Sequence, residues 1–272
     1  MYRKSYRDLV KDHIPPDLYS KLPRSFDVIG DIALIKLPDE LIPYAPQISE
    51  AIMRIHRNVR SVYVRKRVSG VYRVHELIFA GGVEKSETIY TENGVRFYVD
   101  IKKMFVNPRM ATERLRIAGM IRDGELVLDL FSGYGGFSLN IARLREVFIV
   151  AVDLNPEAIN ALRRSIELNK LKGYIEPIHA EARFLVESLR EGIFDVIILD
   201  NPTMIESFVE CIARLLKDRG RVYMYVLTKD IESFRDRVER IGLEVRECID
   251  VREYSPEEYI YRCEVYKKRF IS

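Results

Sequence analysis

The second half of the chain repeats one pattern: a short apolar run, a turn, and a stretch of helical period. The apolar runs are ELVLDLF (125–131), VFIVAVDL (147–154), YIEPIHA (174–180), FDVIILD (194–200) and RVYMYVL (221–227). Helices are predicted from Gly136 and over 156–169, 182–190, 203–217 and 230–240. Short apolar strands that alternate with helices are typical of a parallel sheet covered on both faces. Two later runs, 243–254 and 259–268, alternate with period two and predict an antiparallel hairpin at the sheet edge.

The first half has a different pattern. Strand-like runs over 26–38, 61–70, 72–82 and 87–100 surround one helical stretch, 48–56, which predicts a small α+β domain with an antiparallel sheet. Asn93 and Gly94 lie between two strand patterns and predict a hairpin turn with positive φ. We therefore expect an α/β protein whose Rossmann-like domain holds a mostly parallel seven-stranded sheet. The expected divisions are an N-terminal extension (1–25), the small α+β domain (26–107) and the larger domain (108–272).

Composition excludes several classes of protein. No apolar run approaches the roughly 18 residues that a membrane span needs. The N-terminal sequence MYRKSYRDLVKDH lacks the apolar core of a signal peptide, so we expect a cytoplasmic protein. Three scattered cysteines show no metal-ligand spacing, which predicts free thiols and no metal site. A net charge of +3 argues neither for nor against nucleic acid. A single Gln, no Trp and many Arg and Glu residues are typical of proteins from hyperthermophiles.

A glycine-rich turn follows the first strand of the larger domain. It contains Asp129, Phe131, Gly133 and Gly135 in the sequence DLFSGYGGFS. Such a turn lets the backbone approach a ligand, although a dinucleotide enzyme would show it too. Two details favour S-adenosylmethionine. Asp129 ends the strand, where a carboxylate can bind the ammonium of that cofactor, and the glycine spacing departs from G-x-G-x-x-G.

Acidic side chains also end the next strands. Asp153 and Asn155 follow the second strand, and a carboxylate there can accept both ribose hydroxyls. Glu181 follows the third strand, where it can accept from the adenine amino group, and Asp200 follows the fourth. Each acid taken alone is equally well explained as a helix cap or a solvated turn. Acids at successive strand ends of one sheet together favour the cofactor site.

The junction of the two domains carries VNPRMATERLR (106–116). An ordinary helix start, with Pro108 in the first turn, explains each residue singly. However, Glu113 lies one element before the glycine turn, where a carboxylate can face the cofactor's methyl and act as a general base.

With these motifs, the sequence resembles the archaeal and eukaryotic tRNA methyltransferases that make N1-methylguanosine at position 37. The shared motifs are NPRMATERLRIAGMI, LVLDLFSGYGGFS, DLNPEAI, the fourth-strand DNP and YSPEEYIY (254–261), and the resemblance extends from about residue 26 to the end. It implies that Glu113 removes the N1 proton of guanine and that Arg73 stabilises charge on O6. Arg109 and Arg114 match positions lining the active site and the cofactor. Further implied cofactor contacts are Asp153, Leu154, Glu181, Ala182 and the strand end Asp200, Asn201 and Pro202.

Two departures from the family matter. The family usually has Asn-Leu-Pro at the fourth strand end, whereas this chain has Asp200-Asn201-Pro202, so either Asn201 takes that role or an acid faces the target base. Many archaeal members also carry an additional N-terminal domain that binds the tRNA elbow, and only about 25 residues precede the resemblance here. Recognition should then rest on the anticodon stem-loop, and we expect a monomer.

Three alternatives to N1 methylation stay open. The resemblance includes relatives in wyosine synthesis, so the enzyme could also methylate C7 of 4-demethylwyosine, an option that Asp200 leaves open. It could instead transfer an aminocarboxypropyl group, although the Asn-Pro-Arg at 107–109 favours methyl transfer. A non-catalytic tRNA-binding protein would leave Glu113 and the glycine turn without a role.

Basic and aromatic residues gather in one stretch of the small domain. The candidate RNA-binding residues are Arg54, Arg57, Arg65, Lys66, Arg67 and Tyr72. Arginine and tyrosine together can hold phosphates and stack an extruded base. A solvated strand face is the alternative interpretation.

Overall fold

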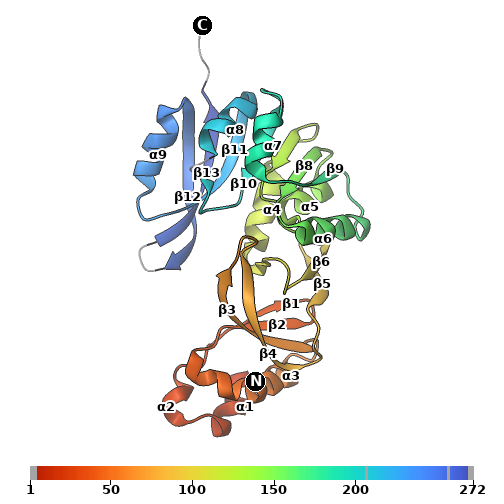
Figure 1. The fold of residues 1–272 in the computed structure, drawn as a ribbon, viewed down its shortest axis with the longest axis vertical. Helices are drawn as coiled ribbons and strands as arrows, with labels where there is room; N and C mark the ends of the chain where they lie inside the picture. Colours follow the sequence, from red (N-terminus) through yellow and green to blue (C-terminus); the bar gives the residue numbers. More distant parts are fainter. Residues whose placement is uncertain (1–4, 206–207, 256–257, 269–272) are drawn as a thin grey trace. The chain divides into compact units, whose positions relative to one another are not determined.

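The computed structural model describes residues 5–205, 208–255 and 258–268. The chain divides into two compact units, Met1–Met110 and Ala111–Ser272, whereas the sequence pattern placed the boundary between residues 107 and 108. Each unit has its own sheet. Figure 1 shows the two parts by their colours, red to yellow and yellow-green to blue.

The second unit is built on a seven-stranded sheet of order β12-β13-β11-β10-β7-β8-β9 (Figure 1). The strands are β7 (Leu126–Asp129), β8 (Phe148–Asp153), β9 (Tyr174–His179), β10 (Phe194–Leu199), β11 (Leu216–Thr228), β12 (Leu243–Ser255) and β13 (Glu258–Lys267). β11, β10, β7, β8 and β9 are parallel to one another, and β13 is antiparallel to both β11 and β12. The expected mostly parallel sheet with an antiparallel hairpin at its edge is therefore confirmed.

Helices of this unit follow the strands in the predicted order. They are α4 (Ala111–Met120), α5 (Gly136–Leu144), α6 (Pro156–Glu167), α7 (Ala182–Ser188), α8 (Val209–Leu215) and α9 (Ile231–Arg240). α8 is shorter than the predicted helix over 203–217, of which residues 206–207 lie outside the described residues. It ends early because β11 begins at Leu216, which pairs with Phe194 of β10.

The two faces of β11 differ in chemistry. Val222, Met224 and Val226 point into a core that they share with residues of α7, α8 and α9. Arg221, Tyr223 and Tyr225 alternate with these residues. They therefore face the opposite side of the sheet, because successive residues of a strand point to opposite faces. They are buried as well, and two of them contact residues of α4. Helices thus cover both faces of the sheet.

The first unit holds a four-stranded sheet and a separate two-stranded hairpin. The sheet order is β1 (Asp27–Ile29), β2 (Ile32–Ile35), β3 (Ser61–Ser69) and β4 (Val74–Gly82), and the hairpin consists of β5 (Glu87–Glu92) and β6 (Val95–Asp100). The expected all-antiparallel sheet is wrong in one pairing, since β2 and β3 are parallel. The connection between them contains η2 (Asp39–Tyr44) and α3 (Ala45–Ile55), which supply the crossover that parallel strands need. The predicted turn is confirmed, with φ of 52° at Asn93 and 75° at Gly94.

The N-terminal segment is part of the first unit's core. It forms α1 (Tyr6–Val10), η1 (Lys11–His13) and α2 (Pro16–Tyr19). Tyr6, Val10, Ile14 and Leu22 are buried in the same hydrophobic cluster as residues of α3 and β2. The segment 1–25, which the sequence pattern set apart, therefore packs with the α+β sheet from residue 6 onward.

The prediction of three free thiols is wrong for two of them. Cys248 and Cys263 form a disulfide between β12 and β13, and Cys211 is free. The two cysteines are 15 residues apart, and this spacing alone does not predict a pairing. The disulfide forms because the register of β12 and β13 places them opposite each other. Within the described ranges, no group of three or more His, Cys, Asp or Glu side chains is placed to hold a metal ion. The helices of those ranges include none that is long and apolar enough to cross a membrane.

Candidate active site

The glycine turn connects β7 to α5 in a conformation that few residues other than glycine adopt. Gly133 and Gly135 have φ of 53° and 88°. Gly135 directly precedes α5, and a Cβ there would lie 2.3 Å from Leu162 Cδ1 of α6. At Gly133 a Cβ would meet nothing within 4 Å. The turn is therefore packed against α6 at one glycine and open at the other, as a ligand cradle requires.

Asp129 lies at the base of this turn with no exposed surface. Its Oδ2 accepts a 2.6 Å hydrogen bond from the Ser138 hydroxyl, while its buried Oδ1 has no hydrogen-bond partner among the described residues. Burial, together with the nearby carboxylates of Asp200 and Asp153, raises the pKa of Asp129 to about 7. A buried acceptor without a donor, close to other acids, suits a site that receives a cation.

Asp153 joins the end of β8 to the glycine turn. Its Oδ2 accepts a 2.8 Å hydrogen bond from the Gly133 amide, and its Oδ1 accepts one of 2.8 Å from the Asn155 amide. Burial raises the pKa of this carboxyl too. Asn155 caps α6 through the Glu157 amide at 3.0 Å. Asn155 is therefore engaged in holding the helix start, whereas the neighbouring Leu154 side chain is 37% exposed.

The ends of the third and fourth strands carry the other predicted cofactor residues. Glu181 precedes α7 and is exposed, and within the described chain its side chain makes no capping hydrogen bond. The helix-cap explanation of this acid therefore does not hold in this structure. Ala182 is buried behind it. Asp200, Asn201 and Pro202 directly follow β10, and Asn201 Oδ1 accepts from the Thr203 hydroxyl at 3.1 Å.

Phe131 and Arg114 support the turn from within the fold. Phe131 packs edge to face on Phe208, with ring centroids 5.2 Å apart. Arg114 is 5% exposed, and its guanidinium lies 5.5 Å from the ring centroid of Tyr134. A Cβ on Gly136 would lie 2.6 Å from Arg114 Nε. Because this residue is glycine, the Arg114 side chain can pack directly against the start of α5.

Glu113 projects from the first turn of α4 into the protein interior and is 8% exposed. Its Oε1 accepts hydrogen bonds of 3.0 Å from the Tyr225 hydroxyl and 3.0 Å from Arg262 Nη1. Tyr225 of β11 and Arg262 of β13 are paired directly across the two strands. Burial raises the pKa of Tyr225 well above its usual value, so the phenol keeps the proton that it donates.

Neither Tyr225 nor Arg262 is predicted from the sequence as a partner of Glu113. The run RVYMYVL predicts an apolar strand, yet Arg221, Tyr223 and Tyr225 recur in it with period two. That period was a usable sign of a polar face. No comparable signal existed for Arg262, because its pairing with Tyr225 depends on the strand register.

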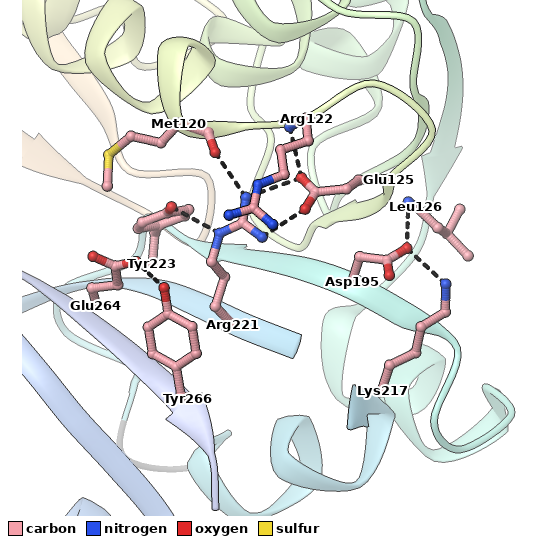
Figure 2. Close-up of polar contacts among 10 residues, drawn as sticks. All are labelled: Met120, Arg122, Glu125, Leu126, Asp195, Lys217, Arg221, Tyr223, Glu264 and Tyr266. Atoms are coloured by element: carbon pink, nitrogen blue, oxygen red, sulfur yellow. Dashed lines mark hydrogen bonds and ion pairs between the residues drawn. The ribbon is translucent and has the colours of Figure 1, made fainter. Parts of the chain in front are cut away.

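The other end of α4 is held by a second cluster of polar contacts, drawn in Figure 2. Arg221 binds both oxygens of Glu125, at 2.7 and 3.0 Å, and donates to the Met120 carbonyl at 2.9 Å and the Tyr223 hydroxyl at 2.9 Å. Because Met120 is the last residue of α4, Arg221 caps its C-terminus. Close by, Asp195 accepts from the Leu126 amide at 2.8 Å and from Lys217 at 2.7 Å. β11 thus contacts both ends of the helix that carries Glu113.

The predicted catalytic and RNA-binding residues of the first unit differ in their surroundings. Arg73 lies exposed in the turn between β3 and β4, with φ of 54°. Arg109 Nε and Arg65 Nη1 bind the two oxygens of the buried Asp27, at 2.8 and 2.5 Å. The remaining candidates are exposed or ion-paired at the surface: Arg54, Arg57 and Tyr72 are exposed, Arg67 pairs with Glu76 at 3.1 Å, and Lys66 pairs with Asp39.

A parallel sheet with a glycine turn and carboxylates at successive strand ends is typical of a Rossmann-like methyltransferase. A family model described as the TRM5/TYW2 methyltransferase domain matches residues 88–251, and one described as the TYW2 N-terminal domain matches residues 6–84. The chain belongs to the TRM5/TYW2 methyltransferase family. The resemblance seen in the sequence is therefore confirmed, and it begins at about residue 6 rather than 26.

Individual relatives agree with this assignment. The chain is 36% identical over 265 residues to tRNA (guanine(37)-N(1))-methyltransferase Trm5b of Pyrococcus abyssi, covering 94% of this chain and 78% of the relative. The crystal structure of wild-type Trm5b from Pyrococcus abyssi superposes with a TM-score of 0.87 at 34% identity, covering 99% of this chain and 82% of the other. The complex of aTrm5 with tRNALeu also superposes with a TM-score of 0.87, at 28% identity and with 98% and 79% coverage.

Proposed function

We propose that this enzyme transfers the methyl group of S-adenosylmethionine to N1 of guanosine 37 in tRNA. The observation that carries the proposal is Glu113, a buried and oriented carboxylate that lies one element before the glycine turn. Relatives named tRNA (guanine(37)-N(1))-methyltransferase Trm5b from Pyrococcus abyssi and Methanocaldococcus jannaschii match 94% and 95% of the chain.

The residues at the strand ends suit this cofactor. S-adenosylmethionine, when bound, supplies an electrophilic methyl on a sulfonium. Asp129 has an acceptor oxygen without a partner among the described residues, which fits an ammonium. Asp153, at the tip of the second strand, would accept from the ribose hydroxyls, and Glu181 from the adenine amino group. Gly133 leaves the space that a close ligand requires.

In the proposed reaction Glu113 acts as general base. The N1–H bond of guanine breaks and its proton passes to Glu113, and the N1 electron pair forms a bond to the methyl carbon as the carbon–sulfur bond breaks. The electron pair of that bond stays on sulfur. Loss of the N1 proton increases the negative charge on O6, which the Arg73 guanidinium would stabilise. Arg109 is the remaining candidate for contacts with the reacting base.

The proposal includes the mode of tRNA binding. The exposed Arg54, Arg57 and Tyr72 support contacts with the anticodon stem-loop, because arginine binds phosphates and tyrosine stacks on bases. We expect binding that weakens steeply with salt, as phosphate contacts require. We further propose that the protein acts as a monomer and in the cytoplasm.

The decisive experiment incubates purified protein with labelled S-adenosylmethionine and a tRNA transcript that carries G37, followed by nucleoside analysis. Label is expected in N1-methylguanosine, and a transcript with A37 is the matched control. Absence of labelled N1-methylguanosine from the G37 transcript refutes the proposal. Glu113→Gln should slow transfer by about 10²–10⁴-fold, the usual contribution of a general base, while the affinity for S-adenosylhomocysteine stays unchanged.

One further substrate is worth testing. The chain is 30% identical over 209 residues to tRNA 4-demethylwyosine(37)-methyltransferase Taw21 of Saccharolobus solfataricus, covering 74% of this chain and 77% of the relative. Asp200 also stands where the family usually has asparagine. Transfer RNA that contains 4-demethylwyosine, supplied in the same assay, shows whether C7 is methylated as well.

A further inference from the structure

A buried arginine contacts the proposed base. Arg262 is 2% exposed, and its Nη1 lies 3.0 Å from Glu113 Oε1. Burying a guanidinium costs free energy unless a counter-charge and hydrogen bonds compensate it. Glu247 is only a partial second partner, because its Oε2 is 3.6 Å from Arg262 Nη2 and its side chain is 55% exposed. Among the residues that the structure describes, the buried counter-charge of Arg262 is therefore Glu113.

The two oxygens of Glu113 are in different situations. Oε1 accepts from both Tyr225 and Arg262. Oε2 receives no hydrogen bond from any residue that the structure describes, and its charged neighbour is Arg116 Nε at 3.8 Å, on a side chain that is 52% exposed. Two donors on paired strands thus fix one oxygen and leave the other available.

The Arg221–Glu125 pair on the same face of the sheet shows what a purely structural ion pair looks like here. Arg221 donates to both oxygens of Glu125, at 2.7 and 3.0 Å (Figure 2). Both oxygens of Glu125 therefore have a donor, and Oε2 also accepts from the Arg122 amide at 2.9 Å. Arg262 instead binds Glu113 through one oxygen only. Oε2 of Glu113 therefore lacks the hydrogen bond that a two-pronged contact would give it. This arrangement is consistent with an oxygen that accepts from a donor on a bound substrate.

We propose that Arg262 and Tyr225 are positioning residues that hold Glu113 by Oε1, so that Oε2 accepts the proton of the substrate. The inference rests on the proposed function, in which that proton comes from guanine N1. The N1–H bond breaks, the proton bonds to Oε2, and the N1 electron pair is released for attack on the methyl carbon. A carboxylate fixed in advance loses little entropy in the reaction, and small misplacement of such a group lowers the rate strongly.

The test measures single-turnover methyl transfer from labelled S-adenosylmethionine to G37 tRNA. Arg262→Met should slow the transfer by about 10- to 100-fold, while the dissociation constant for S-adenosylhomocysteine changes little. Tyr225→Phe should give a smaller loss, and Arg262→Lys should restore part of the rate because it keeps the charge. Arg246→Met is the matched control, since Arg246 is an exposed arginine of β12 that stacks on Tyr266.

A double-mutant cycle separates positioning from a general structural effect. If Arg262 acts through Glu113, then adding Arg262→Met to Glu113→Gln leaves the residual rate unchanged to within about threefold. An Arg262→Met rate equal to wild type, or an equal loss in both backgrounds, overturns the inference. If Arg262→Met does not fold, Tyr225→Phe takes its place in the same cycle. Failure of the wild-type protein to methylate G37 refutes the proposed function itself, whereas an active wild type with a fast Arg262→Met refutes only the positioning role.

Discussion

Asp129 offers a test of the candidate cofactor site through protein stability. Its carboxyl is fully buried at the base of the glycine turn, and burial raises its pKa from an ordinary 3.8 to about 7. A change of one unit in a pKa is worth about 1.4 kcal/mol. The shift therefore sets an upper limit of about 4 kcal/mol on the free energy by which the ionised Asp129 destabilises the folded protein. The ionised side chain therefore destabilises the protein when no ligand is bound.

The sign of the pH effect follows from the direction of the shift. Between about pH 4 and pH 7 the folded protein keeps a proton on Asp129 that the unfolded chain releases, so the free energy of unfolding falls as the pH rises. Above about pH 7 both states are ionised and the effect levels off. Asparagine does not ionise. The variant Asp129→Asn should match the wild type near pH 4 and exceed its stability by up to about 4 kcal/mol at pH 8.

Urea unfolding followed by circular dichroism, at several pH values between 4 and 8, measures this difference. Asp218→Asn, at an exposed carboxylate, is the control and should show no such trend. The same variants also test function. S-adenosylmethionine should stabilise the wild type at pH 8 and stabilise Asp129→Asn much less, because the charge that attracts its ammonium is gone. If the free energies of unfolding of Asp129→Asn and of the wild type differ by the same amount at about pH 4 and at about pH 8, the reasoning is refuted.

Two further changes test the framework of the site, both by the same unfolding measurement. Arg221→Met should cost up to about 3–5 kcal/mol because it leaves the Glu125 carboxylate, whose side chain is only 13% exposed, without its cation, and Glu125→Leu in the same chain should recover much of that loss. A double variant no more stable than Arg221→Met alone contradicts this. Gly135→Ala should destabilise more than Gly133→Ala, since both residues have positive φ, which costs about 1–3 kcal/mol, but only Gly135 also brings its new methyl within 2.3 Å of Leu162. Equal losses of stability in the two variants would show that backbone strain alone, and not the contact with Leu162, sets the cost.

The sequence alone determined the features that depend on local pattern. Apolar runs that alternate with helical stretches predicted the parallel sheet, and the glycine-rich sequence predicted the tight turn in which Gly133 and Gly135 have positive φ. Position along the chain also sufficed to place Asp129, Asp153 and Asp200 together, because the carboxyl ends of parallel strands meet at one edge of a sheet.

Contacts between distant segments could not be predicted in this way. The Cys248–Cys263 disulfide, the parallel pairing of β2 with β3 and the ion pair between Glu113 and Arg262 each depend on strand order or register. A shift of one residue in the pairing of β11 with β13 would turn Arg262 to the opposite face and remove it from Glu113. The sequence thus determined that a carboxylate stands at the start of α4. Only the tertiary structure decided which of its oxygens is held and which is left open, because that depends on side chains brought together from 112 and 149 residues away.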